Sequence, residues 1–206
     1  MTDEQWVLNQ LSHSSNSIAL DIGANVGEWS KVLCSTFSNV IAIEPDPRAF
    51  QELQLLQLSN LTCKNIALSF GDSDSLLYMR PNSVQSSLLK DHPIGAHNRS
   101  EAPIIDTHKI TTLTLDSLVK QYSLNDIGFI KIDVEGFEGN VLSGATDPMF
   151  ENVDWLIEIH DTEKVVLDQL KRLGYGSQHI QYIRHISPIA HPHHFWMYVK
   201  PERNEI

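Results

Sequence analysis

The sequence lacks several features that would assign it to a specialised class of protein. Only two of its 206 residues are cysteine, which excludes a disulfide framework and a four-thiolate metal site. No apolar run approaches the roughly 20 residues that a membrane-spanning helix needs. The N-terminus is acidic and lacks the basic-then-apolar layout of a signal peptide. These absences predict a reduced, cytoplasmic protein without a membrane partner.

Positive charge is also scarce. The chain has 15 Lys and Arg against 26 Asp and Glu, a formal net charge of −11, and its cations are scattered. A protein that binds nucleic acid needs cations that displace the counterions of the phosphate backbone. The charge distribution therefore argues against DNA or RNA as a partner and favours a small molecule. The sequence leaves the oligomeric state open, with a homodimer as one option.

What the sequence does contain is an alternation of strand and helix patterns. Its length suits one domain, residues 1–206, with a sizeable core and an N-terminal cap at 1–16. Short apolar runs predict buried strands at 17–20, 40–43, 61–68, 127–133 and 155–160. Amphipathic stretches between them predict helices, so we expect a parallel sheet covered on both faces. Residues 179–183 and 194–200 alternate like two antiparallel strands.

A glycine-rich turn from Asp21 to Gly27 follows the first predicted strand. Gly23 lets the backbone turn and approach a ligand without a Cβ clash, and Gly27 permits tight helix packing. Ligands of open parallel sheets bind beyond the carboxyl ends of the strands, where this turn lies. Glu44 ends the second predicted strand, where a carboxylate accepts hydrogen bonds from both hydroxyls of a ribose. The motif therefore predicts a site for a nucleoside-containing cofactor.

The spacing of the glycines indicates which cofactor. A dinucleotide fingerprint has a middle glycine that lets pyrophosphate approach the backbone. Ala24 and Asn25 stand in its place, and Asp21 would set a negative charge near the phosphates. S-adenosylmethionine has no phosphate, and its ribose, amino group and sulfonium are compatible with carboxylates. The pattern therefore favours S-adenosylmethionine. An NAD-linked Rossmann oxidoreductase and a non-catalytic cofactor-binding module are the alternatives.

Several stretches of the sequence resemble one family of enzymes. They are Leu20–Gly27, Ile43–Pro45, Asn65–Leu68, Thr114–Asp116 and, most specific, Ile130–Glu138. On these motifs the chain resembles the FkbM-type methyltransferases, a branch of the class I S-adenosylmethionine-dependent enzymes. The resemblance implies an α/β, Rossmann-like three-layer sandwich. Its seven-stranded, mostly parallel sheet would have the order 3-2-1-4-5-7-6 and an antiparallel last strand. O-methylation of a hydroxyl on a sugar or secondary metabolite is also implied.

The resemblance also implies which residues touch the cofactor. The residues of the glycine-rich turn would line its methionine end, Glu44 would hold the ribose, and residues 65–67 would border the adenine. Ser86 lies in a Ser-rich stretch that the family places near the cofactor, and Asp133 ends a later strand. The expected cofactor contacts are Asp21, Gly23, Asn25, Gly27, Glu44, Asn65, Ile66, Ala67, Ser86 and Asp133.

Methyl transfer to a hydroxyl also requires a group that removes the hydroxyl proton, because an alcohol does not ionise unaided near neutral pH. Asp133, Glu135 and His160 are the candidate catalytic residues, since they lie at the ends of two strands predicted to be neighbours. We expect His160 or Asp133 to be the general base. Each candidate also has a structural interpretation: the acids as partners of a helix N-terminus, and the histidine as a hydrogen-bonded core residue.

A divalent metal is a less favoured alternative, and our main expectation is a site without metal. Asp133, His160 and either Glu135 or Glu158 would hold the ion, which would lower the pKa of the acceptor hydroxyl. A ligand set rich in oxygen suits Mg²⁺ or Mn²⁺.

Residues 69–110 interrupt the alternation of strands and helices. The segment 81–103 is rich in Ser, His, Pro and Asn, and only 76–79 has the pattern of a strand. Irregular segments longer than about 12–15 residues are usually functional or disordered. We therefore expect an insertion loop at 69–110 that lies near the site of the methyl acceptor.

Overall fold

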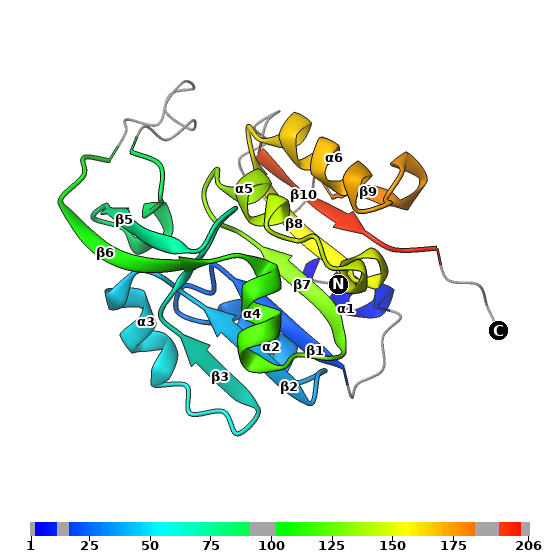
Figure 1. Ribbon diagram of the computed structural model, residues 1–206. Coiled ribbons are helices and arrows are strands. Elements are labelled where there is room, and N and C mark those ends of the chain that lie inside the picture. Colours follow the sequence, from blue (N-terminus) through cyan, green and yellow to red (C-terminus); the bar gives the residue numbers. More distant parts are fainter. Residues whose placement is uncertain (1–2, 12–16, 91–101, 184–193, 203–206) are drawn as a thin grey trace.

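The computed structural model describes residues 3–11, 17–90, 102–183 and 194–202. Its centre is a seven-stranded sheet with the order β3-β2-β1-β7-β8-β10-β9 (Figure 1). The strands are β1 Ile18–Ile22, β2 Asn39–Ile43, β3 Leu61–Lys64, β7 Ile127–Ile132, β8 Asp154–His160, β9 Ile180–Ile183 and β10 His194–Val199. Strand β10 runs antiparallel to both of its neighbours, β8 and β9, and the other pairs of strands are parallel. The predicted fold class and strand order are therefore confirmed.

Helices cover both faces of this sheet, which accounts for the continuous apolar runs of the central strands. Every residue of β7 is buried, and its side chains point alternately to the two faces. One face packs on α4 Leu115–Tyr122, α5 Glu138–Ser143 and α6 Glu163–Arg172. The other packs on α1 Asp3–Gln10, α2 Glu28–Cys34 and α3 Pro47–Gln54. None of the described helices is long and apolar enough to cross a membrane.

The helices begin where the sequence supplies capping residues. The Asp46 side chain accepts a hydrogen bond from the backbone N–H of Arg48, and Pro47 occupies the first turn of α3. The Thr114 hydroxyl likewise accepts from Ser117 at the start of α4. The predicted N-terminal cap contains α1, where Val7 is fully buried. Three short 3-10 turns complete the described elements: η1 Ser83–Gln85, η3 Pro148–Asn152 and η4 Ser177–His179.

The region from 61 to 113 differs from the prediction. The single strand expected at 61–68 is divided, because β3 ends at Lys64 and Ala67–Leu68 form β4 of a second sheet. The Asn65 side chain donates to the carbonyls of Glu44 and Pro45, which holds the chain as it leaves the main sheet.

The prediction of an insertion loop at 69–110 is wrong for much of that segment. Its described part contains β5 Ser73–Met79 and β6 Asp106–Leu113, an antiparallel pair that joins β4 in the order β4-β6-β5. The small sheet lies beside α3 at the left of Figure 1, and Arg48 of α3 donates to the Arg80 carbonyl after β5. Strand β6 is hard to recognise because most of its residues are polar.

Candidate active site

The carboxyl ends of β1, β2 and β7 meet at one edge of the main sheet, and the chain there encloses a cavity. The empty space there amounts to about 640 Å³ when the open solvent at its mouth is included. Gly23 and Asn25 line it after β1, Glu44 after β2, and Asp133 and Glu135 after β7. The segment that includes Ser83, Ser86 and Ser87 closes the other side.

Gly23 brings the ends of two strands together. It has a φ of +74°, and a Cβ at this position would lie 1.7 Å from the Asp133 carbonyl oxygen. Any other residue would therefore separate the turn after β1 from the turn after β7. Gly27 has a different role: its φ is +87°, and a Cβ there would lie 2.5 Å from Leu56 and 2.7 Å from Leu53. It allows α2 to begin against α3 and does not line the cavity.

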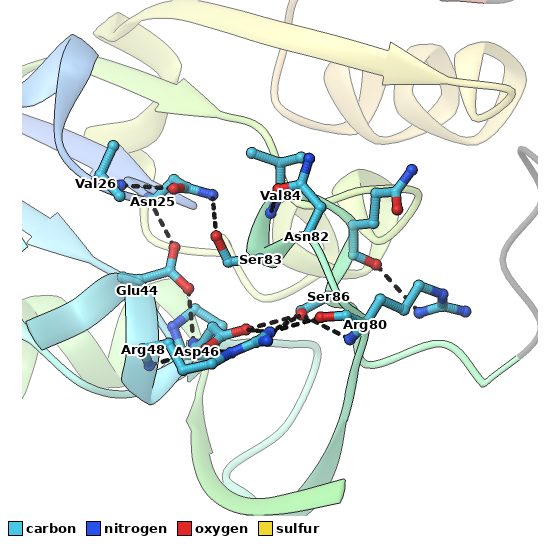
Figure 2. Close-up of polar contacts among 12 residues, drawn as sticks. Asn25, Val26, Glu44, Asp46, Arg48, Arg80, Asn82, Ser83, Val84 and Ser86 are labelled. Carbon is cyan, nitrogen blue, oxygen red and sulfur yellow. Dashed lines mark hydrogen bonds and ion pairs between the residues drawn. The ribbon is translucent and has the colours of Figure 1, made fainter. Parts of the chain in front are cut away.

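Glu44 is held rigidly at the β2 end of the cavity. One carboxylate oxygen accepts from the backbone N–H of Asn25 and the other from that of Asp46, both at 2.7 Å (Figure 2). The side chain is only 5% exposed. Burial raises the pKa of Glu44 to about 7, although the two hydrogen bonds oppose that rise. Each oxygen keeps a further lone pair, so the carboxylate is positioned to accept from two hydroxyls.

A polar network ties the segment after β5 to this end of the cavity. The Ser86 hydroxyl donates to Asp46 at 2.8 Å, and Arg48 donates to the same carboxylate oxygen at 2.6 Å and to the Arg80 carbonyl at 2.8 Å. The Asn25 amide donates weakly to the Ser83 hydroxyl, at 3.4 Å. Figure 2 shows these contacts bridging the glycine-rich turn, the start of α3 and the 80–86 segment. Asp46, Arg48 and Arg80 were not among the residues predicted from the sequence, although Asp46 precedes Pro47 in a pattern typical of a helix N-cap.

A buried lysine lies beneath the β1 and β7 ends. The Lys131 ammonium is 3.3 Å from an oxygen of Asp21 and 3.4 Å from one of Asp133, and it donates to the Gly23 carbonyl at 3.0 Å. Burial alone would raise the pKa of Asp133, but the charges of Lys131 and His160 hold it below its usual value. Asp133 is therefore an ionised group in an ion pair and a weak base.

His160, at the end of β8, is part of a second charged group. Its Nδ1 lies 2.8 Å from Oε1 of Glu138, and its Nε2 lies 3.7 Å from Oε2 of Glu135. Burial disfavours the imidazolium, yet the hydrogen bond with Glu138 and the nearby acids raise the pKa of His160 to about 10. A protonated ring has no lone pair for another proton, which counts against the expectation that His160 is the base.

Glu135 occupies the turn between β7 and α5 in a strained conformation. Its φ of +53° is left-handed, and Gly136 follows at +93°. Such backbone strain in a residue other than glycine is concentrated at functional sites. Burial and the neighbouring acids raise the pKa of Glu135 to about 8, against the opposing charge of His160. Its side chain is 20% exposed and lines the cavity.

The structure brings most of the predicted site residues together and leaves some outside the cavity. The cavity lining includes Gly23, Asn25, Glu44, Ala67, Ser86, Asp133 and Glu135. Asp21 is fully buried below it, where its carboxylate accepts from Ser30 at 2.6 Å. Asn65 and Ile66 also lie outside the lining: Asn65 bonds to backbone carbonyls, and Ile66 packs on the core. Glu158 and His160 stand beyond Asp133, on β8.

The chemistry of the lining distinguishes between the cofactors considered above. Three carboxylates, Glu44, Asp133 and Glu135, line the cavity, and no Lys, Arg or His is among the described residues that do so. A pyrophosphate would meet negative charge without a compensating cation, which disfavours NAD. A nucleoside with a sulfonium and an amino group fits this lining, because its positive charges would face the acids.

Comparisons with known proteins identify the family of this chain. The family described as the methyltransferase FkbM domain matches residues 21–184. The hexuronic acid methyltransferase AglP of Haloferax volcanii is 30% identical over 160 residues, which are 76% of this chain and 62% of that protein. Methyltransferase 1 of Beauveria bassiana is 25% identical over 169 residues, covering 72% of this chain and 66% of that protein. The chain thus spans just under two thirds of the length of these curated relatives.

Solved structures share the fold. A methyltransferase FkbM from Methylobacillus flagellatus superposes with a TM-score of 0.60 at 19% identity, covering 93% of this chain and 45% of that one. A Streptococcus mutans protein assigned as a methyltransferase, in complex with SAH, gives a TM-score of 0.53 at 15% identity and covers 96% and 94%. These likenesses support the fold, while the family match extends over most of the sequence. The chain belongs to the FkbM methyltransferase family.

Proposed function

We propose that this protein binds S-adenosylmethionine and transfers its methyl group to a hydroxyl of a small molecule, a sugar or a related metabolite. One observation carries the proposal: a single cavity runs from Glu44 at β2, past Gly23 at β1, to Asp133 and Glu135 at β7. A ribose at Glu44 would direct the methionine end of the cofactor toward the two acids. The family match and the SAH-bound structural neighbour support this cofactor.

Bound S-adenosylmethionine supplies an activated methyl group on a sulfonium leaving group. The protein's residues would align the acceptor with it, exclude water and remove the acceptor's proton. Glu44 would orient the cofactor, and the Ser83–Ser87 segment, part of which lines the cavity, would cover it. The bound cofactor would retain the carbon–sulfur electron pair on sulfur while the acceptor oxygen forms its bond to the methyl carbon. The hydroxyl proton passes to a protein carboxylate.

We assign the proton to Glu135. It lines the cavity at its methyl-transfer end, whereas His160 lies outside the lining and is hydrogen-bonded to Glu138. Asp133 also lines the cavity, but Lys131 and His160 hold its pKa below the usual value, whereas burial raises the pKa of Glu135 to about 8 and makes it the stronger base. Glu135 is therefore the acid that is placed to take a proton from an acceptor in the cavity.

A hexuronic acid is the acceptor class to test first, because a relative carries that substrate in its name. Such a sugar offers both hydroxyls and a carboxylate for methylation. A carboxylate needs no base, but it would bring another negative charge to a site that already holds Asp133 and Glu135. Our proposal is therefore transfer to a hydroxyl.

Calorimetry followed by a transfer assay tests the function. We expect S-adenosylmethionine and its demethylated product to bind, and NAD not to bind. Labelled methyl groups should then appear on glucuronic acid, its methyl ester or a neutral sugar. Methylation of the methyl ester establishes a hydroxyl acceptor, whereas methylation of the free acid alone indicates the carboxylate. Cofactor binding without transfer to any member of a wide acceptor panel would point to a non-catalytic module and overturn the proposal.

A further inference from the structure

Three side chains that commonly bind metals converge on the β8 side of the cavity. Asp133, Glu158 and His160 each offer one ligand atom, and these atoms lie within 4.8 Å of one another. The arrangement follows from the sheet register: Ile132 pairs with Ile157, so Asp133 stands beside Glu158 on the next strand. Glu158 and His160 are two residues apart and share a face of β8. Ligands 2.0–2.6 Å from one cation lie up to about 4–5 Å apart, so this spacing suits a shared ion.

The histidine is held in the way that metal-binding histidines are held. A ligating imidazole almost always has its second nitrogen hydrogen-bonded to a carboxylate, a carbonyl or water. Here Nδ1 of His160 lies 2.8 Å from Oε1 of Glu138. Glu138 is fully buried and fixed in turn, because it accepts from the Thr162 hydroxyl at 2.6 Å and from the Gly136 N–H at 2.9 Å. Nε2 is then the ring nitrogen that would bind an ion.

The charges around these side chains also favour a cation. Two cationic groups, Lys131 and His160, stand among a larger number of carboxyl groups. The carboxyl groups belong to Asp21, Asp133, Glu135, Glu138 and Glu158. Carboxyl oxygens in a largely buried site are stabilised by a nearby cation. The cavity side of the cluster opens at Asp133 and Glu135, where a ligand could reach an ion.

We propose that Asp133, Glu158 and His160 bind a divalent cation of the Mn²⁺ or Mg²⁺ class. The ion would take the place of the proton on His160, since metal ligands bind in their deprotonated forms. Its role rests on the proposed function. A hydroxyl oxygen of the acceptor would bind the ion beside the cofactor's methyl group and become more acidic, and Glu135 would then take its proton.

Direct titration of Mn²⁺ into the complete protein, followed by electron paramagnetic resonance, tests the site without cofactor or acceptor. We expect one Mn²⁺ bound per chain. Glu158→Gln removes a ligand charge at nearly constant volume and should weaken Mn²⁺ binding at least tenfold. The matched control is Glu52→Gln, because Glu52 is exposed on α3 away from the cavity, and it should bind Mn²⁺ like the parent.

Two further measurements keep the test interpretable. Mn²⁺ should raise the melting temperature of the parent and of Glu52→Gln and should have a much smaller effect on Glu158→Gln, which first must show a cooperative melt. If Glu158→Gln does not fold, His160→Gln replaces it with the same expectation. Equal Mn²⁺ affinity in the ligand variant and the parent, or the absence of binding at millimolar Mn²⁺, would overturn the proposal.

The failures of the two proposals are distinguishable. Mn²⁺ binding that depends on Glu158, in a protein that transfers no methyl group, leaves the metal site standing and removes the proposed function. Methyl transfer that survives exhaustive chelation, in a protein that binds no Mn²⁺, removes the metal site and leaves the function standing.

Discussion

The two ends of the cavity are built in different ways. At the β2 end, backbone N–H groups hold both oxygens of Glu44, and Arg48 and Ser86 hold Asp46, so each acid has fixed partners. At the β7–β8 end, acids outnumber the cations Lys131 and His160. The first end is organised for a neutral group that donates hydrogen bonds, such as a ribose. The second is organised for positive charge and for proton transfer.

The largest effect is expected at the β7–β8 end. Glu135→Gln keeps the size of the side chain and removes the proton acceptor, so kcat should fall by about 100- to 10,000-fold. The affinity for S-adenosylmethionine should change little, because the cofactor's ribose is held at the other end. Stopped assays combined with calorimetry separate the two quantities. Near-normal turnover would show that another group takes the proton.

The next effect concerns stability. Lys131→Met leaves Asp21 and Asp133 without their shared cation, and both Lys131 and Asp21 are almost fully buried. Removing one partner of a buried ion pair costs about 3–5 kcal/mol of stability. We expect the free energy of unfolding, measured in urea, to fall by that amount. Lys31→Met is the surface control, since Lys31 is 46% exposed. A loss below about 1 kcal/mol, the usual worth of a surface pair, would mean that Lys131 does not hold this end together.

At the β2 end, Glu44→Gln should affect binding. Hydrogen bonds to a charged group contribute about 1.5–3 kcal/mol, so the affinity for S-adenosylmethionine should fall about tenfold or more. Turnover at saturating cofactor should be nearly retained, the reverse of the Glu135 result. Cofactor affinity equal to that of the Glu52→Gln control would place the ribose elsewhere.

The raised pKa of Glu44 gives this end a pH dependence. Ribose hydroxyls donate to the ionised carboxylate, so cofactor affinity should fall as pH decreases through about 7. If only the ionised form binds, the affinity falls about tenfold between one pH unit above this pKa and one below it. The stability of the protein without cofactor depends on pH in the opposite direction. The folded protein holds the proton more tightly than the unfolded chain, so Glu44 contributes stability that is lost as pH rises from about 4.5 to about 7.

Calorimetry across this pH range measures the affinity, and thermal melts measure the stability. In Glu44→Gln, which has no carboxyl group at this position, both contributions should disappear. A cofactor affinity that is independent of pH in the parent would contradict the assignment of Glu44 to the ribose.

The smallest effect should come from the segment that covers the cavity. Ser83 accepts from Asn25 over 3.4 Å, a long hydrogen bond, so Ser83→Ala should weaken cofactor binding by only about two- to threefold, near the lower limit for a neutral hydrogen bond. Calorimetry measures the affinity of this variant for the cofactor. A loss as large as that of Glu44→Gln would show that the Ser83–Ser87 segment holds the cofactor as strongly as the strand ends do.

The sequence predicted the main sheet well because its inner strands are buried on both faces and read as continuous apolar runs, as in Ile127–Ile132. It failed at β6, whose residues are mostly polar, and at 61–68, where one apolar run serves two sheets. Neither feature can be read from periodicity, because each depends on which distant segment provides the hydrogen-bonding partner.

In the candidate site, too, some residues could be predicted from the sequence and others depended on contacts with distant segments. Glu44 and Gly23 were recognisable from their spacing around the first two strands. Asp21 carried the same signal, but it belongs to β1 itself, and its side chain points to the α2 face, where it meets Ser30 and Lys131. The orientation of His160 by Glu138 brings together residues 22 positions apart in the sequence, and our metal proposal depends on that contact.

A crystal structure with S-adenosylhomocysteine bound tests the central claim most directly. We predict that both ribose hydroxyls lie within hydrogen-bond distance of the Glu44 carboxylate, and that the sulfur faces the Asp133 and Glu135 end of the cavity. A ribose bound away from Glu44, or a sulfur that points away from these acids, would contradict the assignment of the two ends.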